Sequence, residues 1–161
     1  MMNDRAPPRL RTPAGLIATF FGVGLLPRAP GTWGSLAALP FAWLIQQYLG
    51  RDALALAIIL LFAAGCWAAG RHAATLGGGD PGEVVIDEVA GQWLTLLFVP
   101  ADWRLYALGF VLFRLADILK PWPVNLADQA IGGGLGIMID DVLAAGYAMA
   151  GLYVAGLLLG V

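Results

Sequence analysis

Five acidic residues interrupt apolar segments of this chain, and they are the residues best suited to chemistry. They are the adjacent pair Asp87 and Glu88, the single Asp117, and the adjacent pair Asp140 and Asp141. At the centre of a bilayer each carboxylate would cost roughly 2.5–3.5 kcal/mol, and the cost falls towards the interface. We therefore expect the five acids to converge at one rim of the molecule.

A hard divalent cation is the expected partner of such acids. Several carboxylates at one rim repel each other unless positive charge lies between them. Mg²⁺ takes oxygen ligands and usually keeps waters and a substrate phosphate in its coordination shell. This favours a metal role for Asp87 and Glu88. For Asp140 and Asp141, the sequence allows one to cap a helix while the other binds metal, and it leaves open which.

The structural alternative for any single acid is a charge stabilised by the dipole at a helix N-terminus. It is strongest for Glu83, because the segment from Asp80 to Glu83 reads as a capping box with Pro81 at the first helical position. The lone histidine, His72, stands at the end of an apolar run, and we do not expect it to be catalytic. We expect the one cysteine, Cys66, to be an apolar packing residue.

Positively charged residues lie near the acids in the sequence. Arg114, Asp117 and Lys120 are spaced three apart and so share one helix face. Either Arg114 pairs with Asp117, or Asp117 binds metal while Arg114 or Lys120 contacts a phosphate oxygen. Arg28 and Thr32 belong to a glycine- and proline-rich segment, 22–35, whose backbone amides could approach an anion. A tight turn at a membrane surface has the same composition, and residues 132–136 carry the same ambiguity.

The composition indicates a membrane protein. Of 161 residues, 60% are hydrophobic and 12% charged, with a mean hydropathy of +0.78, whereas a soluble domain is about half apolar and a quarter charged. We predict a single all-α domain, 1–161, built as a polytopic membrane helical bundle. About five transmembrane helices are expected at 35–49, 53–70, 84–99, 105–119 and 142–161. Residues 15–26 are predicted to form a re-entrant or interfacial helix.

The short connections and the charges predict one orientation. The turns at 50–52 and 100–104 are short enough to join antiparallel hairpins. Seven of the nine Lys and Arg residues then fall on the opposite side, which the positive-inside rule makes cytoplasmic. They are Arg5, Arg9, Arg11, Arg28, Arg71, Arg114 and Lys120. All five acids lie at this cytoplasmic end, and Trp33, Trp103 and Trp122 are expected in the interfacial aromatic belts.

Four segments together resemble the phosphatidylglycerophosphatase A family. They are residues 27–35 (PRAPGTWGS), 86–91 (IDEVAG), 113–123 (FRLADILKPWP) and 133–142 (GGLGIMIDDV). Each segment alone is weak evidence, but their combination and order are specific. The resemblance implies an enzyme of the bacterial inner membrane that removes the terminal phosphate of phosphatidylglycerophosphate with Mg²⁺, giving phosphatidylglycerol. Its active site would lie on the cytoplasmic side.

The resemblance also implies roles for individual residues. Its acids carry over onto Asp87, Glu88, Asp117, Asp140 and Asp141 as metal ligands, with Asp87, Glu88 and Asp141 as catalytic residues. Arg28, Thr32, Arg114 and Lys120 are expected to contact the substrate phosphate. The expected partners are a phospholipid substrate and the membrane, with no nucleic acid.

Other classes fit the sequence less well. A membrane phosphatase that uses two histidines is excluded by the single histidine, and a phospho-aspartate enzyme by the lack of any Asp-x-Asp pair. A phosphatidyl-alcohol transferase needs an Asp-Gly motif, which does not occur. An ion-coupled carrier would place its acids near the membrane midplane and often shows internal repeats, whereas these acids are predicted at one end.

Overall fold

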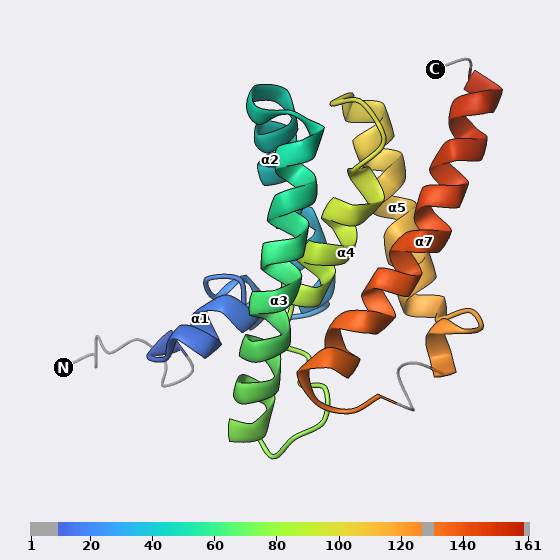
Figure 1. Cartoon of the computed structure of the whole chain (residues 1–161). Helices are drawn as coiled ribbons and strands as arrows, with labels where there is room; N and C mark the ends of the chain where they lie inside the picture. The colour runs from blue at the N-terminus through green and yellow to red at the C-terminus, as the bar shows by residue number, and fades with distance from the viewer. Residues whose placement is uncertain (1–9, 127–130, 160–161) are drawn as a thin grey trace.

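The computed structural model describes residues 10–126 and 131–159, and every regular element within them is helical (Figure 1). The predicted all-α class is confirmed for this part of the chain. In chain order the elements are α1 (Pro13–Ala18), the short 3₁₀ helix η2 (Val23–Leu25), α2 (Pro30–Leu49), α3 (Arg51–Thr75), α4 (Ile86–Leu96), α5 (Trp103–Leu119) and α7 (Gly133–Leu159). Residues 15–26, predicted as one interfacial or re-entrant helix, form α1 and η2 joined by a turn.

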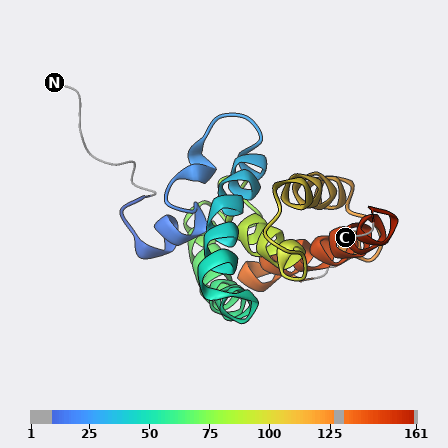
Figure 2. The same ribbon diagram turned by 90° about the horizontal axis from the view of Figure 1, so that it is seen from above.

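The short helix α4 lies at the centre of the bundle. It packs against α2, α3, α5 and α7, and seen from above it lies between α2 and α3 on one side and α5 and α7 on the other (Figure 2). Most of its residues are buried, including the polar side chains of Asp87, Gln92 and Thr95. The first turn of α4 therefore carries its acids into the interior of the protein.

Two connections bring chain segments back along the bundle, as the sequence predicts. Gly50 alone separates α2 from α3, with a φ of 85° that favours glycine. Asp102 is the N-cap of α5, and its side chain accepts hydrogen bonds from the backbone amides of Arg104 and Leu105, at 2.8 and 3.3 Å. Figure 1 shows both connections and the C-terminal end of α7 at one end of the bundle. The acid-bearing start of α4 therefore points to the other end.

The starts of all five long helices differ from the predicted residues, and the shifts at α2 and α4 bear on the site. Helix α2 begins at Pro30, earlier than residue 35, because proline is suited to the first turn of a helix. Thr32 thus lies in a helix and not in a loop. The expected capping box at 80–83 is wrong, since α4 begins at Ile86. Its first turn is held in place instead by the backbone amide of Val85, which donates to Ala18 O at 2.8 Å.

The largest difference is at the last helix, which begins at Gly133 and not at residue 142. Its glycines pack against α3 and do not form a turn: a Cβ on Gly134 would lie 1.8 Å from Cys66 O. Asp140 and Asp141 consequently lie two turns inside α7. The prediction that they open the helix is wrong, and neither of them is an N-terminal cap.

Within the described residues, two helices are long and apolar enough to cross a membrane by length and composition, Arg51–Thr75 and Gly133–Leu158. This is weak evidence for membrane association, and the predicted count of about five spans is not confirmed. Only 22% and 28% of their most apolar windows are buried, so these helices expose much apolar surface. Arg5 and Arg9, which contribute to the predicted charge asymmetry, lie outside the described residues.

Candidate active site

The site is a cluster of three carboxylates at the junction of α4 and α7. Oxygen atoms of Asp87, Glu88 and Asp141 lie within 4.8 Å of one another. Asp87 and Asp141 are buried, and the Glu88 side chain is 14% exposed. Asp141 follows Glu88 by 53 positions, yet it shares one small volume with the adjacent pair because the start of α4 packs against α7.

Each of these carboxylates keeps a buried oxygen that has no hydrogen-bond partner among the described residues. The atoms are Asp87 Oδ1, Glu88 Oε2 and Asp141 Oδ2. Buried polar groups in native proteins almost always have partners, and three acids at this spacing repel each other while burial removes their solvation. The arrangement is therefore costly for the protein alone, and a bound cation would offset that cost.

Arg114 on α5 borders the cluster. Its Nη1 atom lies 2.6 Å from Asp117 Oδ2 and 3.6 Å from Glu88 Oε1, and it donates to the buried hydroxyl of Ser35 at 3.5 Å. The ion pair between Arg114 and Asp117, one of the two alternatives read from the sequence, is present. Arg114 Nε has no partner among the described residues, so this guanidinium retains a donor.

The start of α2 closes one side of the cluster. A Cβ on Gly31 would lie 1.9 Å from Glu88 Oε1 and 3.1 Å from Arg114 Nη1, so a larger residue here would displace the Glu88 carboxylate. Thr32 follows in the first turn of α2. Arg28 is exposed in the preceding turn, with a φ of 61°. Of the two phosphate contacts predicted in segment 22–35, Thr32 comes directly after the glycine that approaches Glu88, and Arg28 lies at the surface.

The other two predicted metal ligands have ion-pair partners. Lys120 Nζ lies 2.8 Å from Asp140 Oδ2, and Asp140 Oδ1 accepts a hydrogen bond from the backbone amide of Asp141 at 3.0 Å. Asp117 pairs with Arg114 but is near enough to repel the charge of Asp141. The structure thus separates the two neighbours on α7: Asp141 belongs to the carboxylate cluster, and Asp140 is paired with Lys120.

His72 and Glu83 form a separate pair, with Nε2 and Oε1 2.7 Å apart. The His72 ring is buried at the end of α3, and Glu83 precedes α4. This contact replaces the capping role predicted for Glu83, because α4 begins at Ile86, five residues after the start that a capping box at 80–83 would require. It ties the end of α3 to the segment that precedes α4.

The sequence reasoning missed two polar residues near the acids. Gln92 is fully buried, and neither atom of its amide has a partner among the described residues. It follows Glu88 by four residues and so lies on the same face of α4. Asp80 is near enough to Asp87 to repel its charge, and it lines a cavity of about 260 Å³ with the start of α7. The sequence did contain a signal for Gln92: it is a polar residue in an apolar segment, four positions after Glu88, where a helix would place both on one face.

The donor set fits a hard divalent cation. All its candidate ligand atoms are carboxylate oxygens, and no histidine or cysteine belongs to the cluster. Mg²⁺ prefers oxygen ligands and is usually held by one or two carboxylates together with waters and substrate phosphate. With the Arg114 guanidinium beside the acids, the arrangement can bind a phosphate group through a cation and a charge-assisted hydrogen bond.

The described residues thus form an all-helical protein with two long apolar helices and a carboxylate centre suited to phosphate chemistry. Residues 16–156 match the family described as Phosphatidylglycerophosphatase A. The chain therefore belongs to the phosphatidylglycerophosphatase A family, as the sequence motifs predict, and it is a phosphatase.

Individual relatives agree with this assignment. The Phosphatidylglycerophosphatase A of Escherichia coli is 42% identical over 157 residues, covering 96% of this chain and 91% of the relative. That of Haemophilus influenzae is 41% identical, covering 87% and 86% of the two chains. A Bacteroides thetaiotaomicron protein, named provisionally as a phosphatidylinositol-3-phosphatase, is 40% identical and covers 90% and 94%. No solved structure matches the chain.

Proposed function

We propose that this protein removes the terminal phosphate of phosphatidylglycerophosphate with the help of Mg²⁺, giving phosphatidylglycerol and inorganic phosphate. The observation that carries the proposal is the buried cluster of Asp87, Glu88 and Asp141, with an unpartnered oxygen on each acid. Family membership supports the reaction, and the names of the Escherichia coli and Haemophilus influenzae relatives support the lipid.

Asp87, Glu88 and Asp141 would hold the metal, and Asp117 and Asp140 are the remaining candidate ligands at the rim. When bound, Mg²⁺ supplies Lewis-acid polarisation of the phosphoryl group and neutralises charge that develops in the transition state. An acid of the cluster that is not needed as a ligand can accept a proton from the attacking water. Asp87 and Asp141 are the buried members suited to this role.

The cations would position the phosphate. Arg114 is held against the cluster by Asp117 and Glu88 and still has the free Nε donor, so it can turn a donor to a phosphate oxygen. Thr32 lies one residue from Gly31, which touches the cluster. Arg28 and Lys120 complete the proposed set, Arg28 as a surface contact that meets the charged headgroup and Lys120 from the end of α5.

The proposed location is the bacterial inner membrane, with several helices crossing it and the acidic site on the cytoplasmic side. Two long apolar helices with mostly exposed surface support membrane insertion. The tight turn at Gly50 and the connection from α4 to α5 lie at the end opposite the acids, which supports placing all the acids on one side. A cysteine introduced at position 28 on a Cys66→Ala background should resist impermeant reagents added outside intact cells.

The second candidate substrate is a phosphatidylinositol 3-phosphate. The Bacteroides thetaiotaomicron relative, at 40% identity, is named as a phosphatase of that lipid. Both lipids present a phosphate monoester on a polyol headgroup. The transferase and carrier alternatives have less support, since the acids gather at one end of the bundle and the family is one of phosphatases.

Phosphate release from purified protein tests the proposal. We would offer phosphatidylglycerophosphate and phosphatidylinositol 3-phosphate in the same detergent, each with Mg²⁺ and with a chelator. Mg²⁺-dependent release from the first lipid, exceeding that from the second, is the expected result. Release that persists unchanged in chelator would disprove the metal, and preference for the inositol lipid would replace the proposed substrate.

A further inference from the structure

Gln92 is a buried amide in the middle of α4 whose hydrogen bonding is incomplete. Its side chain is fully buried, and neither Nε2 nor Oε1 has a hydrogen-bond partner among the described residues. Such an amide gives up its hydrogen bonds to water without replacement, and this costs free energy. Because native proteins rarely keep a buried polar group in that condition, we expect Gln92 to have partners in the working enzyme.

All other buried side-chain atoms without a partner belong to the candidate active site. Across residues 10–126 and 131–159 they are Asp87 Oδ1, Glu88 Oε2, Arg114 Nε and Asp141 Oδ2. The three carboxylate oxygens are acceptors, and Arg114 Nε is a donor. An amide supplies both a donor and an acceptor, so Gln92 complements this set. Its Nε2 atom can donate to a carboxylate, and its Oε1 atom can accept from Arg114.

Glu88 is the acid that faces Gln92 along α4. It precedes Gln92 by four residues, and residues at this spacing share a helix face. Side chains in a helix lean towards its N-terminus, so the Gln92 amide leans towards Glu88. Asp87 precedes Gln92 by five residues and points about 140° away from it. Of the two acids on α4, Glu88 is therefore the one placed to accept a hydrogen bond from Gln92 Nε2.

Arg114 reaches the same level of the bundle from α5. Its Nη1 atom lies 3.6 Å from Glu88 Oε1 and donates to the Ser35 hydroxyl at 3.5 Å. Ser35 lies on α2 one turn after Gly31, the glycine that approaches Glu88, just as Gln92 lies one turn after Glu88 on α4. Because α2 and α4 pack together from their first turns, the guanidinium borders the level of the amide.

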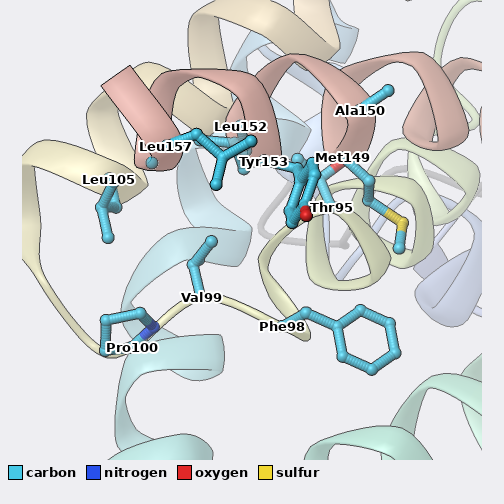
Figure 3. A pocket seen from close by; sticks show the side chains of 11 residues that line it. Thr95, Phe98, Val99, Pro100, Leu105, Met149, Ala150, Leu152, Tyr153 and Leu157 are labelled. Carbon is cyan, nitrogen blue, oxygen red and sulfur yellow. The ribbon is translucent and has the colours of Figure 1, made fainter. Parts of the chain in front are cut away.

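The surroundings on the other side of Gln92 are mostly apolar. Thr95, three residues further along α4, lines a cavity of about 510 Å³ whose other lining side chains are mainly hydrocarbon (Figure 3). The Thr95 hydroxyl donates to Gly91 O at 2.9 Å, so its hydrogen is already used and cannot serve Gln92 Oε1. The partners that complete the amide therefore lie towards the acids.

We infer that Gln92 is a positioning residue of the active site, whose Nε2 donates to Glu88 Oε2 and whose Oε1 accepts from Arg114 Nε. This rests on the proposed function, because it takes the carboxylates to be metal ligands. A hydrogen bond to a ligand carboxylate fixes the direction of its oxygens, and loss of such a partner typically lowers metal affinity or activity by about 10–100-fold. A guanidinium has five N–H donors, so others remain for the substrate phosphate.

Gln92→Met tests this role, since methionine is an unbranched side chain of similar length without an amide. Thr95→Val is the matched control, because it removes a buried polar group from the same helix at the end away from the acids. We expect the Mg²⁺ concentrations that give half of the rise in Tm and half of the maximal phosphate release to increase about tenfold in Gln92→Met. Saturating Mg²⁺ should restore most of kcat, and Thr95→Val should match the wild type. An unchanged Mg²⁺ dependence in Gln92→Met would overturn the inference.

A second measurement needs neither Mg²⁺ nor lipid. In a chelator, the Tm values of the wild type, Gln92→Met, Glu88→Met and the double variant form a cycle. The double variant should be more stable than the sum of the two single changes predicts, because both remove the same hydrogen bond. Additive changes would overturn the inference. Coupling in a protein whose Tm and activity do not respond to Mg²⁺ would support the contact and reject the proposed metal.

The variants are also informative if folding fails. Gln92→Leu replaces Gln92→Met should the methionine variant not fold, because it likewise removes the amide and keeps the position apolar. If neither variant folds while Thr95→Val does, Gln92 serves the fold itself, and the positioning role is overturned.

Discussion

Two groups of acids at the same end of this molecule have opposite surroundings. Glu83 and Asp140 each have a cationic or histidine partner, His72 Nε2 at 2.7 Å and Lys120 Nζ at 2.8 Å. Asp87, Glu88 and Asp141 instead face one another, and each has a buried oxygen with no partner among the described residues. Glu88 also lies 3.6 Å from Arg114 through its other oxygen, so Asp87 and Asp141 show the contrast most clearly. A buried acid with a partner stabilises the fold locally, whereas a buried acid without one indicates a ligand.

The contrast is sharpest between neighbours. Asp140 and Asp141 are identical in type, adjacent in sequence and both buried. The helix turns by about 100° between them, so one faces the end of α5 and the other faces the start of α4. Their orientations, and not their chemistry, therefore separate a paired acid from a proposed metal ligand.

The largest effect should come from removing charge at Asp87 or Asp141, the two clustered acids that have no ion-pair partner among the described residues. Asp87→Asn and Asp141→Asn keep the side-chain shape, and each should lower kcat by about a hundredfold or more, because groups that act as one unit are lost together. The double variant should be little worse than either single one. Added Mg²⁺ should raise the Tm of the wild type by mass action and raise it less in each variant. Phosphate release and melting curves measure both.

Asp140→Asn is the matched control for Asp141→Asn. It removes the same charge one residue away, and we expect a loss of kcat below about tenfold with the Mg²⁺ effect on Tm intact. If Asp140→Asn were as damaging as Asp141→Asn and also abolished the Mg²⁺ effect, the division into paired and unpaired acids would be wrong. Independent, multiplying losses in the double variant would show that Asp87 and Asp141 do not share a site.

Gly31→Ala should have the next largest effect. The added methyl would overlap Glu88 Oε1 and crowd Arg114 Nη1, so Glu88 must move within the cluster. We expect activity to fall about thirtyfold, since a displacement of about 1 Å at a reacting site can cost a hundredfold. Gly146→Ala is the control, because its methyl meets open space. Equal activities of the two alanine variants would show that the approach of α2 does not constrain the site.

Much of the helical layout could be predicted from the sequence. The C-terminal ends of α2 and α5, at Leu49 and Leu119, match the predicted ends, because Gly50 and Pro121 interrupt the apolar pattern there. The starts were harder. Glycines usually end helices, but Gly134 lies inside α7 because α3 approaches it closely, and a contact between distant segments leaves no local signal. The predicted number of membrane spans is likewise not confirmed, since two helices among the described residues pass the length and composition test.

The acids of the candidate site could be found from the sequence, but their grouping could not. Apolar flanks identify all five, because a charge in such a segment is costly. Which of them share a volume depends on the rotation of α7 relative to α4, and that is set by packing across the bundle. Gln92 was missed for a related reason: an amide in a helix has little meaning until burial removes its access to water.

Arg114→Lys sharpens the comparison from the cationic side. A lysine keeps the charge but cannot present several fixed donors to Asp117, Glu88 and Ser35 together. We expect kcat/KM to fall about tenfold, mainly through KM if Arg114 holds the ground-state phosphate. Steady-state kinetics on a well-folded variant measure this. An unchanged kcat/KM would remove Arg114 from phosphate binding and leave it as the partner of Asp117.

The smallest effect on activity should come from the pair of His72 and Glu83. Glu83→Gln keeps a hydrogen-bond acceptor for the ring but removes the charge, so the end of α3 stays tied to the segment before α4 while the contact weakens. Activity should change by less than about twofold, because Glu83 has a partner and is not one of the clustered acids. The Tm should fall slightly, since a hydrogen bond to a charged group contributes about 1.5–3 kcal/mol and a neutral one less. A large loss of activity with an unchanged Tm would place Glu83 in the reaction, and the presence of a partner would then no longer distinguish structural acids from catalytic ones.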